Sequence, residues 1–296
     1  MSPAPVASSL MRALVDDAGL FPPTALDMPD AVARHRADLG AASPVLTHRF
    51  LCPVSRITEL REALAGTDHF DVGLIADSGA DGLADAVAQV AADERLALAG
   101  VEFPLARTGH GDPGAALGAA LTAVSEAGVA DEVPLFVEPV SWNDVPILVE
   151  AIAAGAQGRP VGVKLRCGGV RAELFPSPEQ LALALVAAAR TGVMVKATAG
   201  LHHAVRHTDA STGFVHHGYV NVLVATVDAV LGADADVVAR TLRMDDASQL
   251  IRRVKDVDDE AAERARAILV SYGSCSTSTP LAEARNLTLL SHDHEH

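Results

Sequence analysis

Short apolar runs alternate with longer, alanine-rich segments along most of the chain. The apolar runs are rich in valine, leucine and isoleucine and are typical of buried strands. They predict strands at residues 45–51, 72–76, 98–103, 135–137, 161–165, 193–197 and 268–272, with a weaker first strand at 18–21. The segments between them predict helices at residues 28–39, 57–64, 83–92, 115–127, 143–154, 178–189 and 222–231.

Repeated strand–helix alternation predicts a parallel sheet covered by helices. About eight such units, over roughly 250 residues or more, favour a closed (β/α)8 TIM-type barrel. An open doubly wound sheet would carry a GxGxxG motif after its first strand, and the sequence has none there. We therefore expect one barrel domain over residues 1–296, with a helical excursion at about 234–266 and a loose tail at 291–296.

Composition narrows the range of partners. Hydrophobic residues make up 49% of the chain, which allows a large core. The net charge of −15 disfavours nucleic acid and anionic membrane surfaces as partners. The three cysteines are widely spaced, which suits a reducing compartment, and we see neither a signal peptide nor a membrane-length apolar run. These features predict a cytoplasmic protein that acts on a small molecule; a homo-oligomer is possible.

Ionisable side chains stand at the ends of most predicted strands. In a barrel, chemistry gathers where strands end and the following loops begin. The residues at these positions are Arg49, Asp77, Glu102, Glu138, Lys164, Arg166, Lys196 and Thr198. They could be ordinary salt bridges at the rim, but their regularity favours a functional site.

The use of lysine points to amine chemistry. Of 23 basic residues only Lys164, Lys196 and Lys255 are lysines, and two of them end consecutive predicted strands. An amine can lose its proton and attack a carbonyl, whereas a guanidinium cannot. Two ammonium groups in one apolar cavity also lower one another's pKa. We therefore predict a lysine that forms a Schiff base.

The segment Val-Lys-Ala-Thr-Ala-Gly at residues 195–200 resembles the strand-end motif of class I aldolases of the deoxyribose-phosphate type. The resemblance implies that Lys196 forms the imine and that Lys164 lowers its pKa. In that family the second lysine follows the imine lysine along the chain, whereas here Lys164 comes first. The two roles therefore remain interchangeable.

The other candidate residues can be assigned roles in imine chemistry at this lysine. Glu102 or Glu138 would move protons, which works best if burial raises its pKa. An anionic group would be held by Arg49, by Arg166 with the Cys-Gly-Gly sequence that follows it, and by the 273–276 loop with Ser274 and Ser276. Asp77, Thr198, His202, His203 and Asn221 are further candidates for substrate contact, although Asn221 could simply cap a helix. The histidine-rich segment 200–218 could close over the site.

The sequence thus favours a lyase of the aldolase type acting on a small anionic carbonyl compound, without a cofactor. One alternative is a divalent-metal isomerase, epimerase or hydrolase with Glu102, Glu138, His203 and His207 as ligands. Another is a barrel that binds a metabolite without catalysis. Cys275 is expected to be a buried free thiol, since no base is tied to it by sequence.

Overall fold

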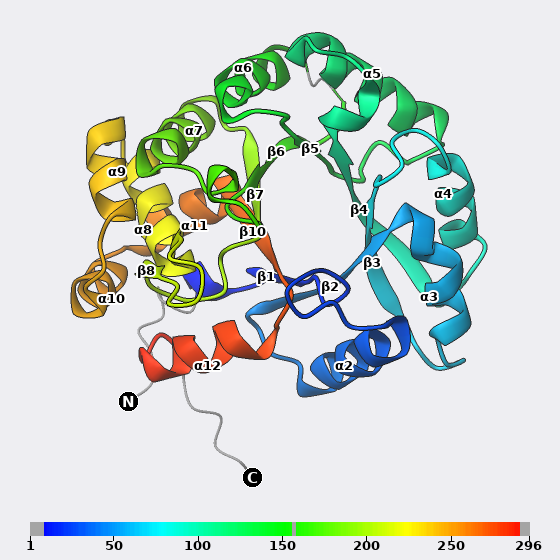
Figure 1. Cartoon of the computed structure of the whole chain (residues 1–296), viewed down its shortest axis with the longest axis horizontal. Helices are drawn as coiled ribbons and strands as arrows, with labels where there is room; N and C mark the ends of the chain where they lie inside the picture. Colours follow the sequence, from blue (N-terminus) through cyan, green and yellow to red (C-terminus); the bar gives the residue numbers. More distant parts are fainter. Residues whose placement is uncertain (1–8, 156–157, 291–296) are drawn as a thin grey trace.

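Eight parallel strands close into a barrel in the computed structural model, which describes residues 9–155 and 158–290 (Figure 1). Around the barrel the order is β1, β10, β7, β6, β5, β4, β3 and β2. The strands are β1 (Val15–Asp17), β2 (Leu46–Pro53), β3 (Phe70–Ile75), β4 (Leu96–Pro104), β5 (Leu135–Glu138), β6 (Val161–Arg166), β7 (Met194–Thr198) and β10 (Leu269–Ser274). The predicted TIM-type barrel is therefore confirmed.

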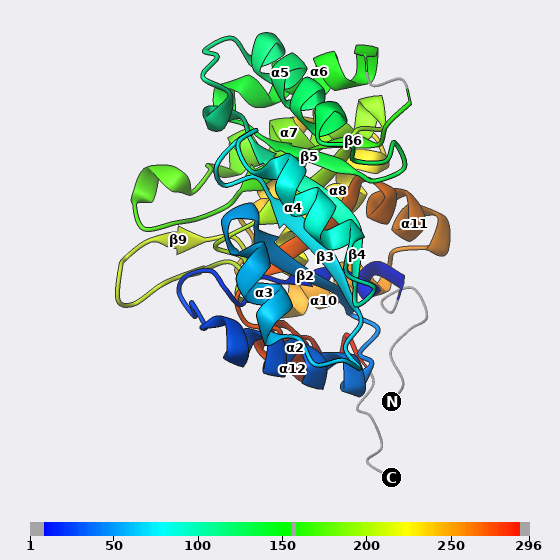
Figure 2. The same cartoon turned by 90° about the vertical axis from the view of Figure 1, so that its right-hand side faces the viewer.

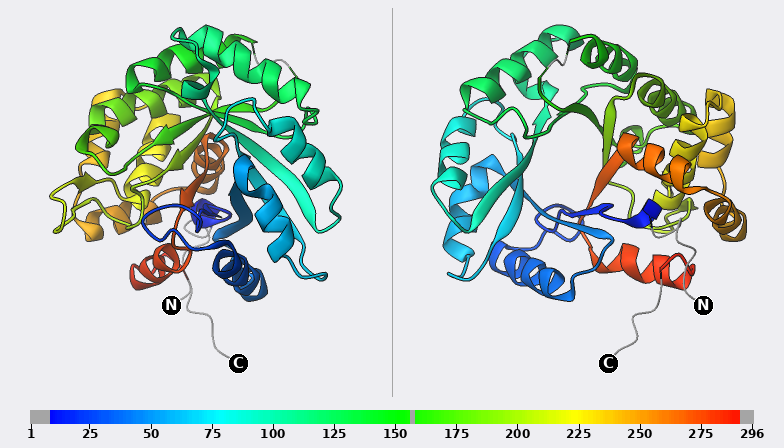
Figure 3. Two further views of the ribbon diagram at one scale, coloured as in Figure 1. Left: turned by 45° about the vertical axis from the view of Figure 1, so that its right-hand side comes forward. Right: turned by 180° about the vertical axis from the view of Figure 1, so that it is seen from behind.

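Helices surround the barrel, as Figure 1 and the rear view in Figure 3 show. They are α2 (Met28–Ala41), α3 (Ile57–Ala63), α4 (Leu83–Ala91), α5 (Pro113–Glu126), α6 (Val145–Gly155), α7 (Pro178–Thr191), α8 (Tyr219–Val230) and α12 (Ser278–Asn286). Three more stand between α8 and β10, over the region of the predicted excursion: α9 (Ala235–Leu242), α10 (Ala247–Lys255) and α11 (Asp259–Ile268). The tail at 291–296 lies outside the described residues.

Local sequence signals fix where several helices begin. Ser177 accepts a hydrogen bond from the Gln180 backbone, while the Gln180 side chain accepts one from Ser177 N, and Pro178 opens α7. Ser141 and Asp144 form the same reciprocal cap at the turn that carries Trp142. These caps stand where the chain after β5 and after β6 enters the next helical segment.

The first strand is misplaced by the sequence pattern. It spans Val15–Asp17, whereas the predicted segment 18–21 is a turn that follows it. Two aspartates in a strand of three residues break the apolar run on which the prediction depended. The strand is nevertheless fully buried, because both carboxylates find charged partners inside the fold.

The side view shows the loops that follow the strands gathered at one end of the barrel, where the hairpin β8 (His207–Thr208) and β9 (Val215–His216) projects (Figure 2). None of the helices in the described ranges has both the length and the apolarity that crossing a bilayer requires.

Candidate active site

Lys164 and Lys196 point into the same barrel interior. They are aligned partners on the neighbouring parallel strands β6 and β7, so their side chains face the same way. Both are buried, with 5% and 1% of the residue exposed, respectively. The sequence prediction that two scarce amines share one interior is therefore met by the geometry.

Glu102 links the two amines. Lys164 Nζ lies 2.7 Å from Glu102 Oε2 and 3.0 Å from Glu138 Oε2. Lys196 Nζ forms a short contact with Glu102 Oε1. Each ammonium therefore has carboxylate partners, and the two lysines are bridged rather than left to repel one another.

Asp16 is the third carboxylate of this cluster. Its Oδ2 lies 2.8 Å from Lys196 Nζ and accepts a hydrogen bond of 2.7 Å from Ser271 Oγ. Its Oδ1 accepts hydrogen bonds from Thr47 Oγ1 at 2.7 Å and from Arg49 Nη1 at 3.2 Å. Asp16 is fully buried, so these partners replace its lost hydration.

The carboxylates reverse the predicted pKa shifts. Burial favours the neutral amine of Lys164, but Glu102 and Glu138 outweigh it and raise the lysine's pKa. Burial also opposes ionisation of Glu102, yet Lys164 and Lys196 lower its pKa to about 2. The pKa of Glu138 is likewise lowered, because Lys164 and Arg166 outweigh burial. The expectations of an amine deprotonated by repulsion and of a glutamate with a raised pKa are therefore wrong.

Two cavities meet at Lys164. The first, of about 420 Å³, is lined by Trp142, Val140 and Val145 among others, and we call it the tryptophan cavity. The second, of about 460 Å³, is lined by Cys275, His202 and Arg107 among others, and we call it the cysteine cavity. Both cavities share the same five lining residues: Pro104, Glu138, Lys164, Arg166 and Leu174.

Arg166 is the most accessible charge in this shared wall. Its Nε donates to Glu138 Oε1 at 2.9 Å, while 44% of its side chain remains exposed. Lys164, by contrast, keeps 6% of its side chain exposed. An anion entering either cavity would therefore meet the Arg166 guanidinium before it meets the amine.

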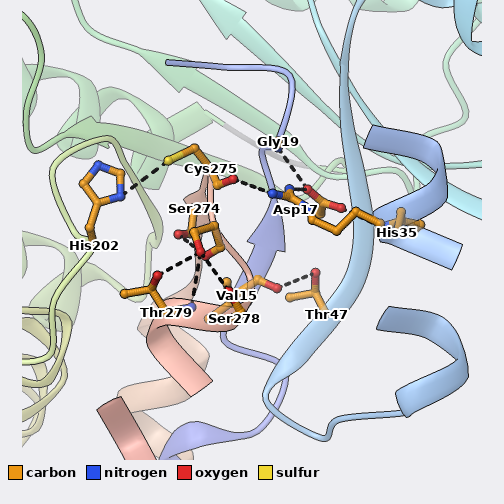
Figure 4. Close-up of polar contacts among 12 residues, drawn as sticks. Val15, Asp17, Gly19, His35, Thr47, His202, Ser274, Cys275, Ser278 and Thr279 are labelled. Carbon is orange, nitrogen blue, oxygen red and sulfur yellow. Dashed lines mark hydrogen bonds and ion pairs between the residues drawn. The ribbon is translucent and has the colours of Figure 1, made fainter. Parts of the chain in front are cut away.

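Cys275 and His202 form a pair in the wall of the cysteine cavity (Figure 4). Cys275 Sγ lies 3.6 Å from His202 Nδ1. Burial opposes ionisation of the thiol, but hydrogen bonds with His202 and Thr24 lower its pKa to about 7. Cys275 is buried, as expected, and the fold brings it beside His202, a neighbour that the sequence spacing did not reveal.

The loop that carries Cys275 is held from the other side by α2. Arg34 Nη1 donates to the Cys275 carbonyl oxygen at 2.6 Å, and the same guanidinium pairs with Asp17 at the end of β1. Asp17 also lies 3.0 Å from His35 Nδ1 (Figure 4). These contacts fix the position of the thiol relative to the barrel.

Three other predicted site residues line the cysteine cavity: Asp77, Thr198 and His202. Asp77 is restrained there, because its carboxylate accepts hydrogen bonds from Ser55 N at 3.2 Å and from Ser55 Oγ at 2.6 Å.

Four other predicted contacts line neither cavity and have partners within the fold. Arg49 donates to buried Asp16, which requires a counter-charge. Asn221 is fully buried, accepts from Arg206 N, and donates to the carbonyls of Thr241 and Met244. The hydroxyls between the end of β10 and the start of α12 bond locally: Ser274 to the Ser276 carbonyl, and Ser276 with Ser278 and Thr279. Contact of these residues with a substrate stays a prediction.

The glycines after Arg166 bring two loops together. A Cβ on Gly168 would lie 2.7 Å from Gly200 Cα, and one on Gly200 would lie 2.4 Å from the Cys167 carbonyl oxygen. Gly200 also has a positive φ of 71°, which favours glycine. The Cys167 N–H donates to the Thr198 carbonyl oxygen. An anion held by the N–H groups of the following glycines stays a prediction.

The remaining histidines lie apart from the lysines. His203 Nδ1 lies 2.5 Å from Glu283 Oε1, and the His203 and His207 rings meet at 4.4 Å between centroids. Both histidines line a separate hollow with Glu283, whereas Glu138 lines the barrel cavities. Within residues 9–155 and 158–290, no three His, Cys, Asp or Glu side chains are grouped to hold a metal ion. The alternative ligand set Glu102, Glu138, His203 and His207 is therefore not brought together.

The hairpin of segment 200–218 packs beside the loop that follows β6. The ring of Phe175 lies 5.4 Å from that of Phe214 and 4.6 Å from that of His216, measured between centroids. His202, at the base of this segment, reaches the cysteine cavity. Closure of the hairpin over the site stays a prediction.

Sequence reasoning missed Asp16 and Arg107. Asp16 lies in the short strand that the apolar pattern did not reveal. Arg107 lines the cysteine cavity from the turn Leu105–Thr108 that follows β4. Its position just past the end of the predicted strand 98–103 was the available signal, but the only site residue proposed from that strand was Glu102.

No family model and no curated protein matches this chain. Among solved structures, the chain is similar to the apo form of a protein from Toxoplasma gondii ME49 provisionally assigned as a deoxyribose-phosphate aldolase, with 14% identity, 95% coverage of both chains and a TM-score of 0.41. It is also similar to N-isopropylammelide isopropylaminohydrolase from Burkholderia multivorans ATCC 17616, with 17% identity, coverage of 87% of this chain and 72% of that chain, and a TM-score of 0.38.

Proposed function

We propose that this protein is an aldolase-type lyase that forms an imine between Lys164 and a small anionic carbonyl compound. The observation that carries the proposal is the position of a buried, carboxylate-bridged amine at the junction of two cavities. An uncharged lysine amine forms carbinolamines and imines with carbonyl carbons once an adjacent base has taken its proton.

Lys164, rather than Lys196, is our candidate for the imine. Lys164 lines both cavities, whereas Lys196 is held deeper by Asp16 and Glu102. The sequence resemblance gave the imine to Lys196 but left the roles interchangeable. We give Lys196 a role different from the one the resemblance implies, in which its ammonium keeps Glu102 ionised beside the reacting amine.

The amine must lose a proton before it can attack, and Glu138 is the carboxylate placed to accept it. Glu138 Oε2 lies 3.0 Å from Lys164 Nζ, and Arg166 holds the other Glu138 oxygen. A substrate anion that draws Arg166 away removes one of the charges that lower the pKa of Glu138. Proton transfer from Lys164 to Glu138 then becomes easier, so substrate binding itself promotes activation of the amine.

The bond changes follow from this arrangement. Lys164 Nζ adds to the carbonyl carbon, the carbonyl oxygen leaves as water, and a protonated imine remains. A C–C bond one carbon away then breaks, and its electron pair moves toward the imine nitrogen to give an enamine. The proton of the departing fragment's hydroxyl passes to Glu138, which releases an aldehyde. Protonation of the enamine carbon and hydrolysis return the free amine.

Borohydride reduction tests this function. The protein is incubated with acetaldehyde, pyruvate and glyoxylate in turn, reduced, and weighed intact. We expect one adduct per chain in the wild type, its loss in Lys164→Met, and its retention in Lys255→Met, since Lys255 is exposed at the end of α10. Adducts that persist in Lys164→Met would refute the assignment.

A further inference from the structure

The two cavities that meet at Lys164 differ in chemistry. The cysteine cavity carries a further cation, Arg107, together with His202, Cys275 and apolar side chains such as Leu51 and Ile75. The tryptophan cavity adds no further cation; it adds the apolar residues Pro139, Val140, Trp142 and Val145 and the polar residues Ser141, Asn143, Glu173 and Gln180. A ligand attached at Lys164 can therefore direct an anionic group toward Arg107 and an apolar group toward Trp142.

The apolar wall is held in place. The turn that carries Trp142 is closed by Ser141 N donating to Asp144 Oδ2 at 3.1 Å and by Asn143 N donating to Ser141 Oγ at 3.2 Å. Val140, just before this turn, leaves 64% of its surface exposed. A large aliphatic side chain and an indole ring thus face accessible space next to a buried amine, and apolar matter placed there would be removed from water.

We propose that the tryptophan cavity is a subsite for a hydrocarbon arm of the carbonyl substrate, so that the preferred substrates are aldehydes or ketones with an apolar chain of several carbons. This inference rests on the proposed function, because the arm is placed by its attachment at Lys164. The anionic group of the same substrate would lie in the cysteine cavity, near Arg107 and Arg166. The cavity thereby defines which carbonyl compounds are retained long enough to react.

Trp142 is the only tryptophan in the chain, so its fluorescence reports on this cavity without any need for catalysis. Hexan-1-ol has no carbonyl and forms no imine, yet it carries the proposed arm. We expect it to shift Trp142 emission in a saturable manner in both the wild type and Lys164→Met, whereas ethanol at the same concentration has little effect. A response to hexan-1-ol that stays linear, or that equals the response to ethanol, would overturn the subsite.

Imine trapping gives the second readout. Each aliphatic carbon buried favours binding by about 0.8 kcal/mol, which corresponds to about fourfold in affinity. We expect hexanal to be trapped at half-maximal yield at a concentration at least tenfold below that for acetaldehyde. Trp142→Ala should remove most of this advantage, because it weakens the trapping of hexanal far more than that of acetaldehyde. Val140→Ser should remove part of the advantage of hexanal, and it keeps Trp142 as the fluorescent reporter. This variant therefore remains informative if Trp142→Ala fails to fold.

Leu183→Ser is the matched control, because Leu183 is an aliphatic side chain on α7 with 54% of its surface exposed. Equal trapping of hexanal and acetaldehyde in the wild type would overturn the subsite while leaving the imine in place. Saturable binding of hexan-1-ol without any adduct at Lys164 would instead refute the proposed function and leave an apolar binding cavity.

Discussion

Lys164 Nζ lies 3.0 Å from Glu138 Oε2, and both side chains line the same two cavities. This pairing shapes the chemistry of the site, because Glu138 both raises the pKa of the amine and is the nearest base exposed to a ligand. The Lys164 amine is therefore held in its protonated form, and the proton must move before the amine can react.

Glu138→Gln should change the pH dependence of imine formation. Because Glu138 helps to raise the pKa of Lys164, its removal should lower that pKa, and loss of such a charge typically moves a pKa by about one to three units. The rising limb of the rate should therefore move to lower pH, while the maximal rate falls because the base is gone. The rate of trapped adduct formation across pH 6–11 (roughly the range of lysine titration) measures both effects.

Glu126→Gln serves as the control for that series, since Glu126 is exposed at the end of α5. A pH profile that is unchanged in Glu138→Gln would show that Glu138 does not control the protonation of Lys164.

Arg166→Ala should separate anionic from neutral substrates. Arg166 is the accessible cation of the shared wall, so its loss removes the group that recruits a carboxylate. We expect the half-saturating concentration for trapping pyruvate to rise about tenfold or more, while that for acetaldehyde changes much less. Equal effects on the trapping of pyruvate and acetaldehyde would show that Arg166 does not recognise the anionic group.

Cys275 should be the thiol that alkylates fastest at neutral pH. Its pKa is lowered to about 7, mainly by the hydrogen bond with His202, whereas burial raises the pKa of Cys52 and Cys167 to about 12. Iodoacetamide at pH 7 followed by peptide mass analysis should find Cys275 modified first, and His202→Ala should slow this by about tenfold. His203→Ala, which alters the neighbouring histidine, should not slow the modification of Cys275. Preferential modification of Cys52 or Cys167 would contradict this ranking.

Asp16→Ala should destabilise the fold strongly, although sequence reasoning assigned Asp16 no role. Its removal leaves buried Lys196 and partly buried Arg49 without this partner, and breaking a buried pair such as Asp16–Lys196 costs about 3–5 kcal/mol. Urea denaturation followed by circular dichroism measures the loss. Asp85→Ala on the exposed face of α4 is the control and should change the free energy of unfolding by less than about 1 kcal/mol.

Glu102 should make the stability of the fold sensitive to acid. Its pKa is about 2 in the fold against an ordinary value of 4.5, so its stabilising effect is complete above pH 4.5 and is lost as pH falls toward 2. In Glu102→Gln the free energy of unfolding should be lower than that of the wild type at pH 4.5, and it should fall less steeply as the pH drops toward 2. An identical slope in the two proteins would refute the coupling of Glu102 to the lysines.

The barrel was predictable because it depends on local patterns. The apolar runs at β2–β7 and β10 and the cap at Ser177 are visible in the sequence, and a repeated strand–helix unit has few ways to close. The three-residue strand β1 was not predictable from apolar periodicity, since two of its three residues are aspartates.

Part of the site was also predictable from local sequence features. Lys164 and Lys196 stand out by scarcity and by position, and the parallel register brings them together. Their protonation could not be inferred, because Asp16 and Glu102 come from distant segments and reach the amines only through barrel closure. The pairing of His202 with Cys275 is equally non-local, as it joins the loops after β7 and β10.

The most direct test of the account is to locate the reduced adduct within the chain. With only three lysines, proteolysis and peptide mass analysis after borohydride reduction distinguish every candidate side chain. We predict substrate mass on the peptide that contains Lys164, in one copy per chain, with Lys196 and Lys255 unmodified. Modification of Lys196 in place of Lys164, or no adduct at either lysine with any carbonyl compound tested, would contradict it.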